Sequence, residues 1–382
     1  MKKRCHAAVL SSIVSGLFLS GGSFTQPTAA FDSVPFVASP RPKEIGVLRK
    51  NHKLRKVVFI GKGKIKGPED VAIDEQGRLY SGSTFNGKIY RITPATANGA
   101  EVTQVFADPG GGMTLGLMFI KGGDLIACNC PKGLLSIDKD GKVTTLVEKI
   151  DGKPLYWADD LDIASDGKVY FSEASRAHKL VSEYDTMFLD LLEGNPYGKL
   201  FVYDPVSKET RLLLKDLYFA NGVALSKDED YVLVNETFRY RVRRFWLKGP
   251  KAGTNDIFAD NLPGMCDGIN RDPEGNYWVS IVAPRTAYMD FVQARPRLKR
   301  FDSHLPRFMW GKIDHYGMVL KLDQSGTIID CLRDPSGKVW TVTNTVPWKN
   351  FLFLGSLRGN AIARYDLSND LSKQPCNRSL PP

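Results

Sequence analysis

The chain has 382 residues, and its hydrophobic content of 42% is ordinary for a soluble protein with a packed core. Its 35 glycines, 22 prolines and 10% aromatic residues suit many short strands joined by turns. The formal net charge of +10 is spread along the chain, without a basic helix or an alternation of basic and aromatic residues, so nucleic-acid binding is not expected.

Residues 1–30 have the pattern of a secretory signal peptide. Basic residues at positions 2–4 precede an apolar run over residues 7–19, and a cleavage site follows at Ala30. The run is shorter than the ~20 residues that a membrane-spanning helix needs. We therefore expect a secreted or periplasmic protein. The alternative is an uncleaved N-terminal anchor, which would associate the chain with a membrane.

The rest of the chain predicts an all-β fold after a linker or surface arm over residues 31–53. Apolar and polar residues alternate over residues 54–65, and six strand-rich segments separated by Asp-x-x-Gly or Ser-Asp-Gly turns follow. Their spacing of ~40–50 residues is that of a propeller blade. Residues 54–382 thus predict a six-bladed β-propeller, whose last blade the 54–65 strand could complete. An array of sandwiches is the alternative.

Two aromatic-rich insertions interrupt the repeats, at residues 176–196 and 286–312. Both have partly helical patterns, and both leave from the same side of their blades. They could cap the central channel and shape a substrate pocket. Plain surface loops are the alternative.

Four polar residues stand where the innermost strand of a blade is expected to begin: Glu69, Asp159, Asn221 and Asp267. Because innermost strands surround the channel of a propeller, these side chains could converge there. Ca²⁺ prefers ~6–8 oxygen ligands from carboxylates and amides, and buried carboxylates without a cation would repel one another. The four residues therefore predict a central site for Ca²⁺ or another divalent cation. Asp160 could replace Asp159, and any one of the four taken alone could be a turn or cap residue.

The stretch from residue 219 to 280 resembles the strictosidine synthase-like family, which includes the adipocyte plasma-membrane-associated proteins. The segments FANGVALS, VLVNET, RRFWLKGPKAG and LPGMCDGINRDPEGNYWV carry the resemblance, which extends more thinly over residues 46–367. It implies membership of a wider group of calcium-dependent six-bladed propellers that includes paraoxonase, the gluconolactonases and diisopropyl fluorophosphatase. Glu69, Asn221 and Asp267 match metal ligands of that group. Asp159 falls where its hydrolytic members have an asparagine.

One departure from this family affects the expected function. Strictosidine synthase uses a glutamate as acid and base, but the matching stretch, TVTNTVPWKN, has Thr343 or Asn344 there. Neither side chain ionises in a useful range. What remains is metal-assisted hydrolysis of a small-molecule ester or lactone, with Asp267 or Asp159 as the catalytic general base. The alternative is a non-enzymatic propeller with a structural calcium ion that binds a ligand or a partner.

Cysteines and histidines give little support for other chemistry. Cys128 and Cys130 lie on one face of an expected strand, so we expect them to be buried and predict no zinc site. Only His178, in the first insertion, is well placed for a pocket. The chain has neither the Gly-x-Ser-x-Gly motif of serine hydrolases nor a phosphate-binding glycine loop.

Overall fold

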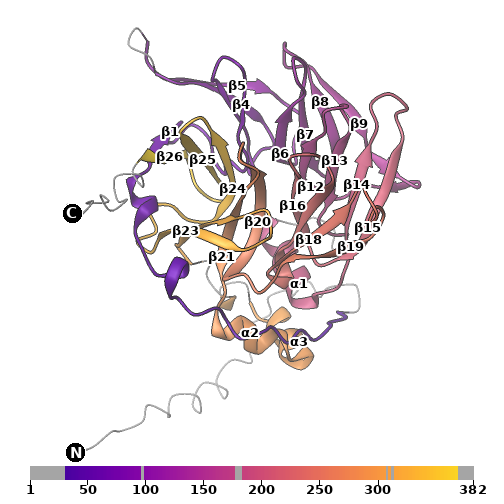
Figure 1. The fold of residues 1–382 in the computed structure, drawn as a ribbon, viewed down its shortest axis with the longest axis vertical. Helices are drawn as coiled ribbons and strands as arrows, with labels where there is room; N and C mark the ends of the chain where they lie inside the picture. Colours follow the sequence, from indigo (N-terminus) through magenta and orange to yellow (C-terminus); the bar gives the residue numbers. More distant parts are fainter. Residues whose placement is uncertain (1–30, 96–98, 177–182, 307–308, 311–313, 369–382) are drawn as a thin grey trace, which may run out of the picture. The chain divides into compact units, whose positions relative to one another are not determined.

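Six four-stranded antiparallel sheets make up the fold, and each follows the previous one in the sequence (Figure 1). The computed structural model describes residues 31–95, 99–176, 183–306, 309–310 and 314–368. The expected signal peptide and His178 lie outside these residues. In the unit that begins at Ser33, the described residues form the predicted six-bladed β-propeller.

The strands of the first three blades are β2–β5 (Ala72–Ile73, Leu79–Gly82, Ile89–Thr93, Val102–Ala107), β6–β9 (Met113–Phe119, Leu125–Cys130, Gly133–Ile137, Val143–Val147) and β12–β15 (Ala158–Ile163, Val169–Glu173, Gly198–Tyr203, Thr210–Leu217). Those of the last three are β16–β19 (Ala220–Leu225, Tyr231–Glu236, Arg241–Trp246, Asn255–Ala259), β20–β23 (Gly264–Arg271, Tyr277–Pro284, Gly317–Leu322, Ile328–Asp334) and β24–β26 (Val342–Trp348, Phe351–Ser356, Ile362–Asp366) with β1 (Val58–Ile60). A small hairpin, β10 (Lys149–Ile150) and β11 (Lys153–Pro154), joins blades 2 and 3.

The position of a strand within its blade explains its composition. The inner strands β7 (LIACNC) and β16 (ANGVAL) are buried at every residue, because neighbouring blades cover both faces of each sheet. The outermost strand β15 (TRLLLKDL) has exposed residues between partly buried ones. Exposed polar residues are therefore found mainly at the rim, and the inner strands appear in the sequence as short apolar runs.

The first strand of the chain completes the last blade. Strand β1 pairs antiparallel with β26, and Phe59 lies opposite Ala363. The alternation over residues 54–65 predicted a strand here; only Val58–Ile60 form it, and residues 53–56 form a 3₁₀ turn instead. This pairing closes the ring of blades and covers an edge that β26 would otherwise expose.

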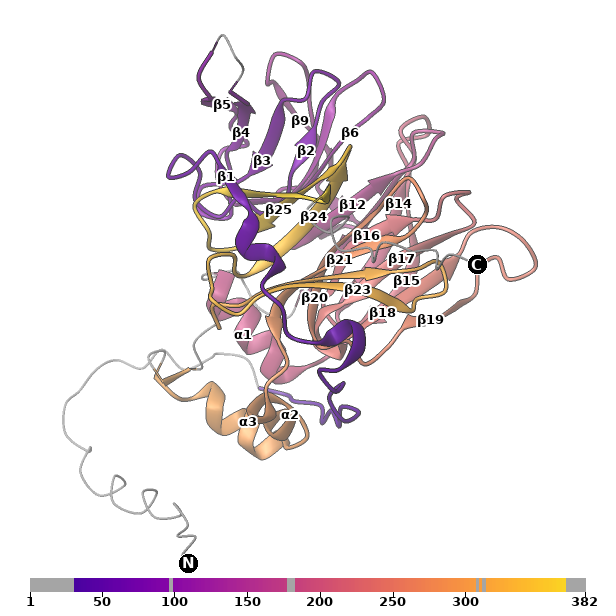
Figure 2. The same cartoon turned by 60° about the vertical axis from the view of Figure 1, so that its left-hand side comes forward.

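Both insertions contain helices, and the helices gather at one end of the propeller (Figures 1 and 2). Helix α1 (Glu183–Glu193) lies between β13 and β14, and α2 (Ala287–Gln293) and α3 (Pro296–Ser303) lie between β21 and β22. Thr286 caps α2, since its side-chain oxygen accepts a hydrogen bond from the Met289 amide at 3.1 Å. Pro296 begins α3, where its missing N–H costs nothing. No helix in the described residues is long and apolar enough to span a membrane.

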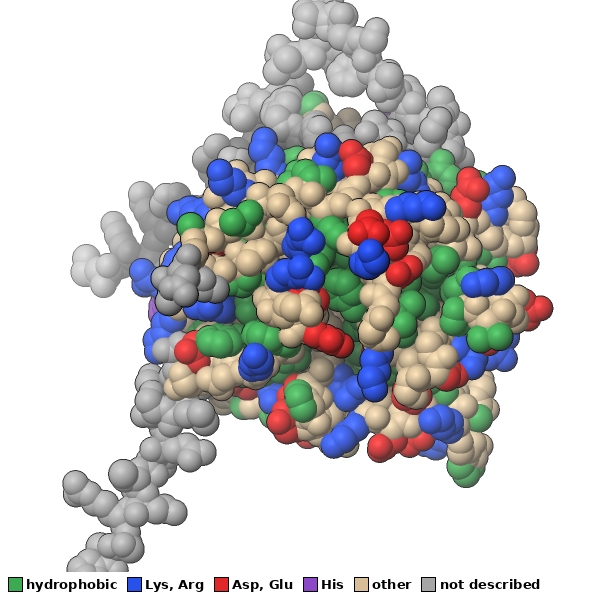
Figure 3. Space-filling model, turned by 90° about the horizontal axis from the view of Figure 1, so that it is seen from above, with side chains coloured by type: hydrophobic (Ala, Val, Ile, Leu, Met, Phe, Trp, Pro, Cys, Tyr) green, Lys and Arg blue, Asp and Glu red, His purple; other side chains and the backbone are tan. Residues whose placement is uncertain are grey.

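Residues 33–53, called the arm below, connect these helices to the last blade. The Val34 and Phe36 amides donate to the carbonyl oxygens of Glu193 in α1 and Gln293 in α2, at 2.9 and 2.8 Å. Further along the arm are two 3₁₀ turns, η1 (Gly46–Leu48) and η2 (Lys53–Lys56). At the other end of the propeller, away from the helices, acidic and basic side chains are interspersed (Figure 3).

Candidate metal centre and adjoining pocket

The innermost strands share one irregularity. In β12 the pairing register shifts between Ala158 and Leu161, and equivalent shifts occur in β6, β16, β20 and β24. Such β-bulges redirect side chains and are common next to active sites. The first residues inside these bulges, with the equivalent residue before β2, are Glu69, Leu115, Asp159, Asn221, Asp267 and Thr343, called the first ring below. The residues that follow them are Asp70, Gly116, Asp160, Gly222, Gly268 and Asn344, called the second ring.

The second ring binds neighbouring blades together. Asp70 accepts a hydrogen bond from the Leu117 amide of blade 2 at 2.7 Å. Asp160 accepts from the Val223 amide of blade 4 at 3.1 Å and from the Leu161 amide at 2.8 Å, so both its oxygens are engaged. Asn344 of blade 6 donates to Asp70 at 2.5 Å. The second-ring acids therefore have a structural role in the channel.

The first ring contains all four predicted metal ligands. Glu69, Asp159, Asn221 and Asp267 are buried, with 7%, 4%, 5% and 6% of their surface exposed. The pKa of Glu69 is raised well above its usual value, first by burial and then by the nearby charges of Asp267, Asp70 and Asp159. Carboxylates from blades 1, 3 and 5 thus repel one another inside the channel.

The other two members of the first ring are not acidic. Thr343 donates to the backbone oxygen of Glu69 at 2.6 Å, and Leu115 belongs to an apolar cluster. Within the described residues, no group of three or more His, Cys, Asp and Glu side chains is close enough to hold a metal ion as it stands. Even so, the donor chemistry fits a hard cation, because the four predicted ligands offer only carboxylate and amide oxygens.

Apolar side chains occupy the positions two residues before the first ring in blades 2–5. These residues, called the apolar ring, are Met113, Trp157, Phe219 and Met265. The rings of Trp157 and Phe219 meet edge to face with their centroids 5.4 Å apart. Phe219 has a φ of 60°, a left-handed conformation that is strained for a bulky residue and is often found at functional sites. The corresponding positions in blades 1 and 6 are the small residues Gly67 and Thr341.

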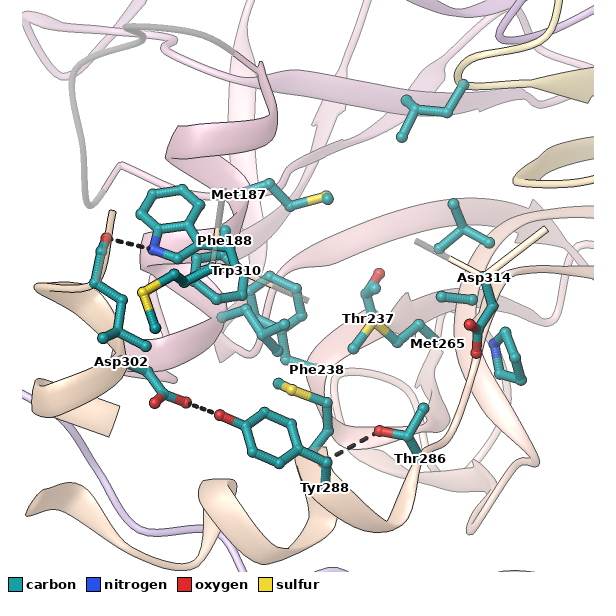
Figure 4. Close-up of a pocket in the computed structure, with 18 residues that line it drawn as sticks. Met187, Phe188, Thr237, Phe238, Met265, Thr286, Tyr288, Asp302, Trp310 and Asp314 are labelled. Atoms are coloured by element: carbon teal, nitrogen blue, oxygen red, sulfur yellow. Dashed lines mark hydrogen bonds between the residues drawn. The ribbon is translucent and has the colours of Figure 1, made fainter. Parts of the chain in front are cut away.

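A cavity of about 320 Å³ lies between helices α1–α3 and the adjacent ends of blades 4–6 (Figure 4). It is lined by Met187, Phe188, Leu191, Thr237, Phe238, Met265, Val282, Ala283, Pro284, Thr286, Tyr288, Met289, Asp302, Leu305, Met309, Trp310, Asp314 and Leu357. Met265 belongs both to this lining and to the apolar ring. Leu191 and Phe238, also in the lining, pack in one cluster with Leu115 of the first ring. The pocket therefore adjoins the channel.

Other residues considered from the sequence lie elsewhere. Cys128 and Cys130 are buried, as expected. His304 is exposed and bonds to the Arg300 carbonyl oxygen, and the His315 ring stacks on Trp340 at 4.0 Å.

The sequence reasoning missed the apolar ring, and of the second ring it considered only Asp160 as a metal ligand. Both could have been found by aligning the six inner strands on Glu69, Asp159, Asn221 and Asp267. In this alignment Asp70 and Asp160 would occupy equivalent positions. Four large apolar residues would stand two positions before the first-ring residues of blades 2–5. The bulges themselves leave no signal in the sequence.

A closed ring of six four-stranded blades places the protein in the class of six-bladed β-propellers. A gluconolactonase from Xanthomonas campestris has a similar structure, with a TM-score of 0.59 and 16% identity over 82% of this chain and 90% of that one. A calcium-binding regucalcin from Agrobacterium tumefaciens is also similar, with a TM-score of 0.54 and 15% identity over 80% of this chain and 92% of that one. At these identities the likeness shows the fold.

Sequence comparisons identify the family. The family models for strictosidine synthase and for the strictosidine synthase-like N-terminal region match residues 159–250 and 46–92. The adipocyte plasma membrane-associated protein of Bos taurus is 31% identical over 364 residues, which cover 91% of this chain and 87% of the relative. Strictosidine synthase-like protein 6 of Arabidopsis thaliana is 33% identical over 313 residues, 81% of each chain. The chain belongs to the strictosidine synthase-like family.

Proposed function

We propose that the protein is a calcium-dependent hydrolase that acts on small-molecule esters or lactones at the first ring. The observation that supports this most is the burial of Glu69, Asp159 and Asp267 in one ring; burial first, and then the nearby charges of Asp267, Asp70 and Asp159, raise the pKa of Glu69. Several buried carboxylates destabilise a fold unless they are protonated or a cation offsets their charge. A divalent cation between them would do so.

Glu69, Asp159, Asn221 and Asp267 would hold the cation. Asp159 is preferred to Asp160 because both oxygens of Asp160 already accept backbone hydrogen bonds. When bound, Ca²⁺ would polarise the substrate carbonyl and make attack by water easier. Asp267 or Asp159 would take the proton from the attacking water. The apolar ring would keep bulk water away, since it surrounds the channel on the side of blades 2–5.

The names of the solved neighbours, a gluconolactonase and a calcium-binding regucalcin, agree with this proposal. We also propose that the protein is secreted or periplasmic, on the evidence of residues 1–30. The name of the bovine relative keeps association with a membrane as the alternative.

The competing function is a non-enzymatic propeller that binds a ligand or a partner and has a structural cation. One observation favours it: Asp70 and Asp160 accept hydrogen bonds from backbone amides of neighbouring blades, an interaction that needs no cation. Enzyme and binder differ in whether the cation is needed for turnover or only for stability.

The test is hydrolysis of phenyl acetate and a panel of lactones by a chain starting at residue 31, with Ca²⁺ and then with a chelator. We expect activity that disappears on chelation and returns with Ca²⁺. Asp267→Asn should lower kcat/KM by at least ~100-fold. Asp140→Asn, at a side chain that is 74% exposed on blade 2, should have no effect.

Two other results of this experiment would contradict the proposed calcium-dependent hydrolase. Activity that survives chelation would contradict the role of the cation. No turnover of any substrate, together with a melting temperature that falls on chelation, would favour the structural-cation alternative.

A further inference from the structure

We infer that the pocket beneath helices α1–α3 binds the hydrophobic acyl or alkyl part of the substrate. The inference rests on the proposed function, and it names a substrate class that differs from the sugar lactones suggested by the gluconolactonase neighbour. Four observations carry it: the chemistry of the lining, the pairing of its polar atoms, its continuity with the first ring and the asymmetry of the apolar ring.

Most of the lining consists of thioether, aromatic and aliphatic side chains, and the exceptions are Thr237, Thr286, Asp302 and Asp314. Four methionines face the cavity, and methionine adapts its shape to flexible apolar ligands. A volume of about 320 Å³ is at the lower end of the range for small-molecule pockets, ~300–1,000 Å³. The pocket therefore has the size and the surface for a short hydrocarbon chain or an aromatic ring.

The polar groups of the lining are mostly paired with protein atoms. The Tyr288 hydroxyl donates to Asp302 at 2.6 Å and joins α2 to α3 across the pocket (Figure 4). The Thr237 hydroxyl donates to the Cys266 carbonyl oxygen at 2.8 Å, and the Thr286 oxygen accepts from Met289. A sugar binds where polar groups are available for its hydroxyls, and leaving those hydroxyls unpaired is costly. This pocket favours hydrocarbon over sugar.

The pocket lining adjoins the first ring through two residues. Met265 lines the cavity and stands two residues before Asp267 on β20. Leu115 supplies an apolar member of the first ring and packs in the same cluster as Leu191 of α1. A ligand could therefore place its chain in the pocket and its carbonyl group at the carboxylates.

The asymmetry of the apolar ring sets the direction of such a ligand. Large apolar residues stand before the first ring in blades 2–5, whereas Gly67 and Thr341 occupy these positions in blades 1 and 6. Glu69 stands two residues after Gly67, on blade 1. The hydrocarbon part would lie along blades 4 and 5 under the helices, and the carbonyl end would lie toward Glu69.

The first experiment measures kcat/KM for p-nitrophenyl esters from acetate to decanoate, with δ-gluconolactone for comparison. Each added methylene buried in the pocket should raise kcat/KM about fourfold until the pocket is full. Met187→Gln and Met289→Gln should lower the ratio of decanoate to acetate activity at least ~10-fold. Phe291→Gln is the matched control, because this α2 residue is 52% exposed and lies outside the lining; it should leave the ratio unchanged.

The second experiment measures binding without turnover. The neutral fluorescent ligand N-phenyl-1-naphthylamine should bind the wild-type chain and be displaced by decanoate. Met187→Gln and Met289→Gln should weaken this binding, and Phe291→Gln should not.

The two experiments separate this inference from the proposed function. Binding that decanoate displaces, without hydrolysis of any ester, would overturn the proposed function and retain the pocket as a site for hydrocarbon chains. Hydrolysis with no dependence on chain length, or a preference for δ-gluconolactone, would overturn the inference and retain the hydrolase.

Discussion

Gly222 shows how little room the second ring leaves around the candidate metal centre. A Cβ atom at this position would stand 2.5 Å from the backbone oxygen of Asp267 and 2.6 Å from the Ile269 amide nitrogen. Gly116 is equally constrained, since its Cβ would be 2.7 Å from the Asp160 carboxylate. Glycine at these positions lets one inner strand approach the next closely enough for cross-blade hydrogen bonds.

We therefore expect Gly222→Ala to destabilise the protein by about 1–3 kcal/mol through overpacking. It should also lower any Ca²⁺-dependent activity, because Asp267 must shift. The control is Gly123→Ala, where a Cβ would meet nothing closer than 3.6 Å. Urea unfolding of both variants checks the prediction, and equal midpoints would contradict it.

The sequence alone predicted some members of this site and not others. Glu69, Asn221 and Asp267 could be found because a polar residue is conspicuous at the start of an apolar strand. The choice between Asp159 and Asp160 could not be made, because a bulge changes which residue faces the channel. The apolar ring could not be recognised from any one strand, because Trp157 and its equivalents look like ordinary core residues, and only an alignment of the six inner strands reveals it.

At the level of elements, the helices depend on a buried lysine. Lys299 in α3 is fully buried and donates to the Val34 carbonyl oxygen of the arm at 2.6 Å and to that of Glu193 in α1 at 3.5 Å. Burial, with a smaller contribution from Arg239, lowers the pKa of Lys299 to about 8. One side chain thus joins the arm and two helices of the pocket.

The lowered pKa of Lys299 predicts a pH dependence of stability. Between pH 8 and about 10.5 the lysine is neutral when folded but still protonated when unfolded, so the free energy of unfolding should rise with pH. The gain should reach about 2 kcal/mol by pH 10. We expect the urea midpoint of the wild type to rise from pH 7 to pH 10 relative to that of Lys299→Met.

Lys121→Met, at an exposed lysine of blade 2, serves as the control for this experiment. It should follow the wild type at every pH. A constant difference between wild type and Lys299→Met would mean that the lysine keeps its ordinary pKa in the folded protein.

The strands and helices were predictable as elements, but the path of the arm was not. Local patterns indicated the blade repeats and the helical insertions. The arm is held by residues distant in the sequence. One of them is Arg333, whose side chain is 1% exposed and whose Nη1 atom lies 2.5 Å from Oε1 of Glu44. Nothing in the sequence near Glu44 indicates that its partner lies in blade 5.

For the whole molecule, the pairing of β1 with β26 predicts the effect of removing the beginning of the chain. A chain that starts at residue 61 should have a much lower melting temperature than one that starts at residue 33, and it should aggregate, because β26 becomes an exposed edge. Adding a synthetic peptide of residues 33–60 should raise the melting temperature of the shorter chain. Equal melting temperatures for the two chains would show that β1 contributes little to closure.

The same pairing has a consequence for the order of events during synthesis. Among the strands of the described residues, β1 leaves the ribosome first and its partner β26 leaves last, so β1 waits for the other blades to be made. Contacts between such distant segments form slowly because the intervening chain must first be brought together. During translation five blades can form in turn while the ring stays open, and the unpaired β1 is available to other chains until β26 emerges.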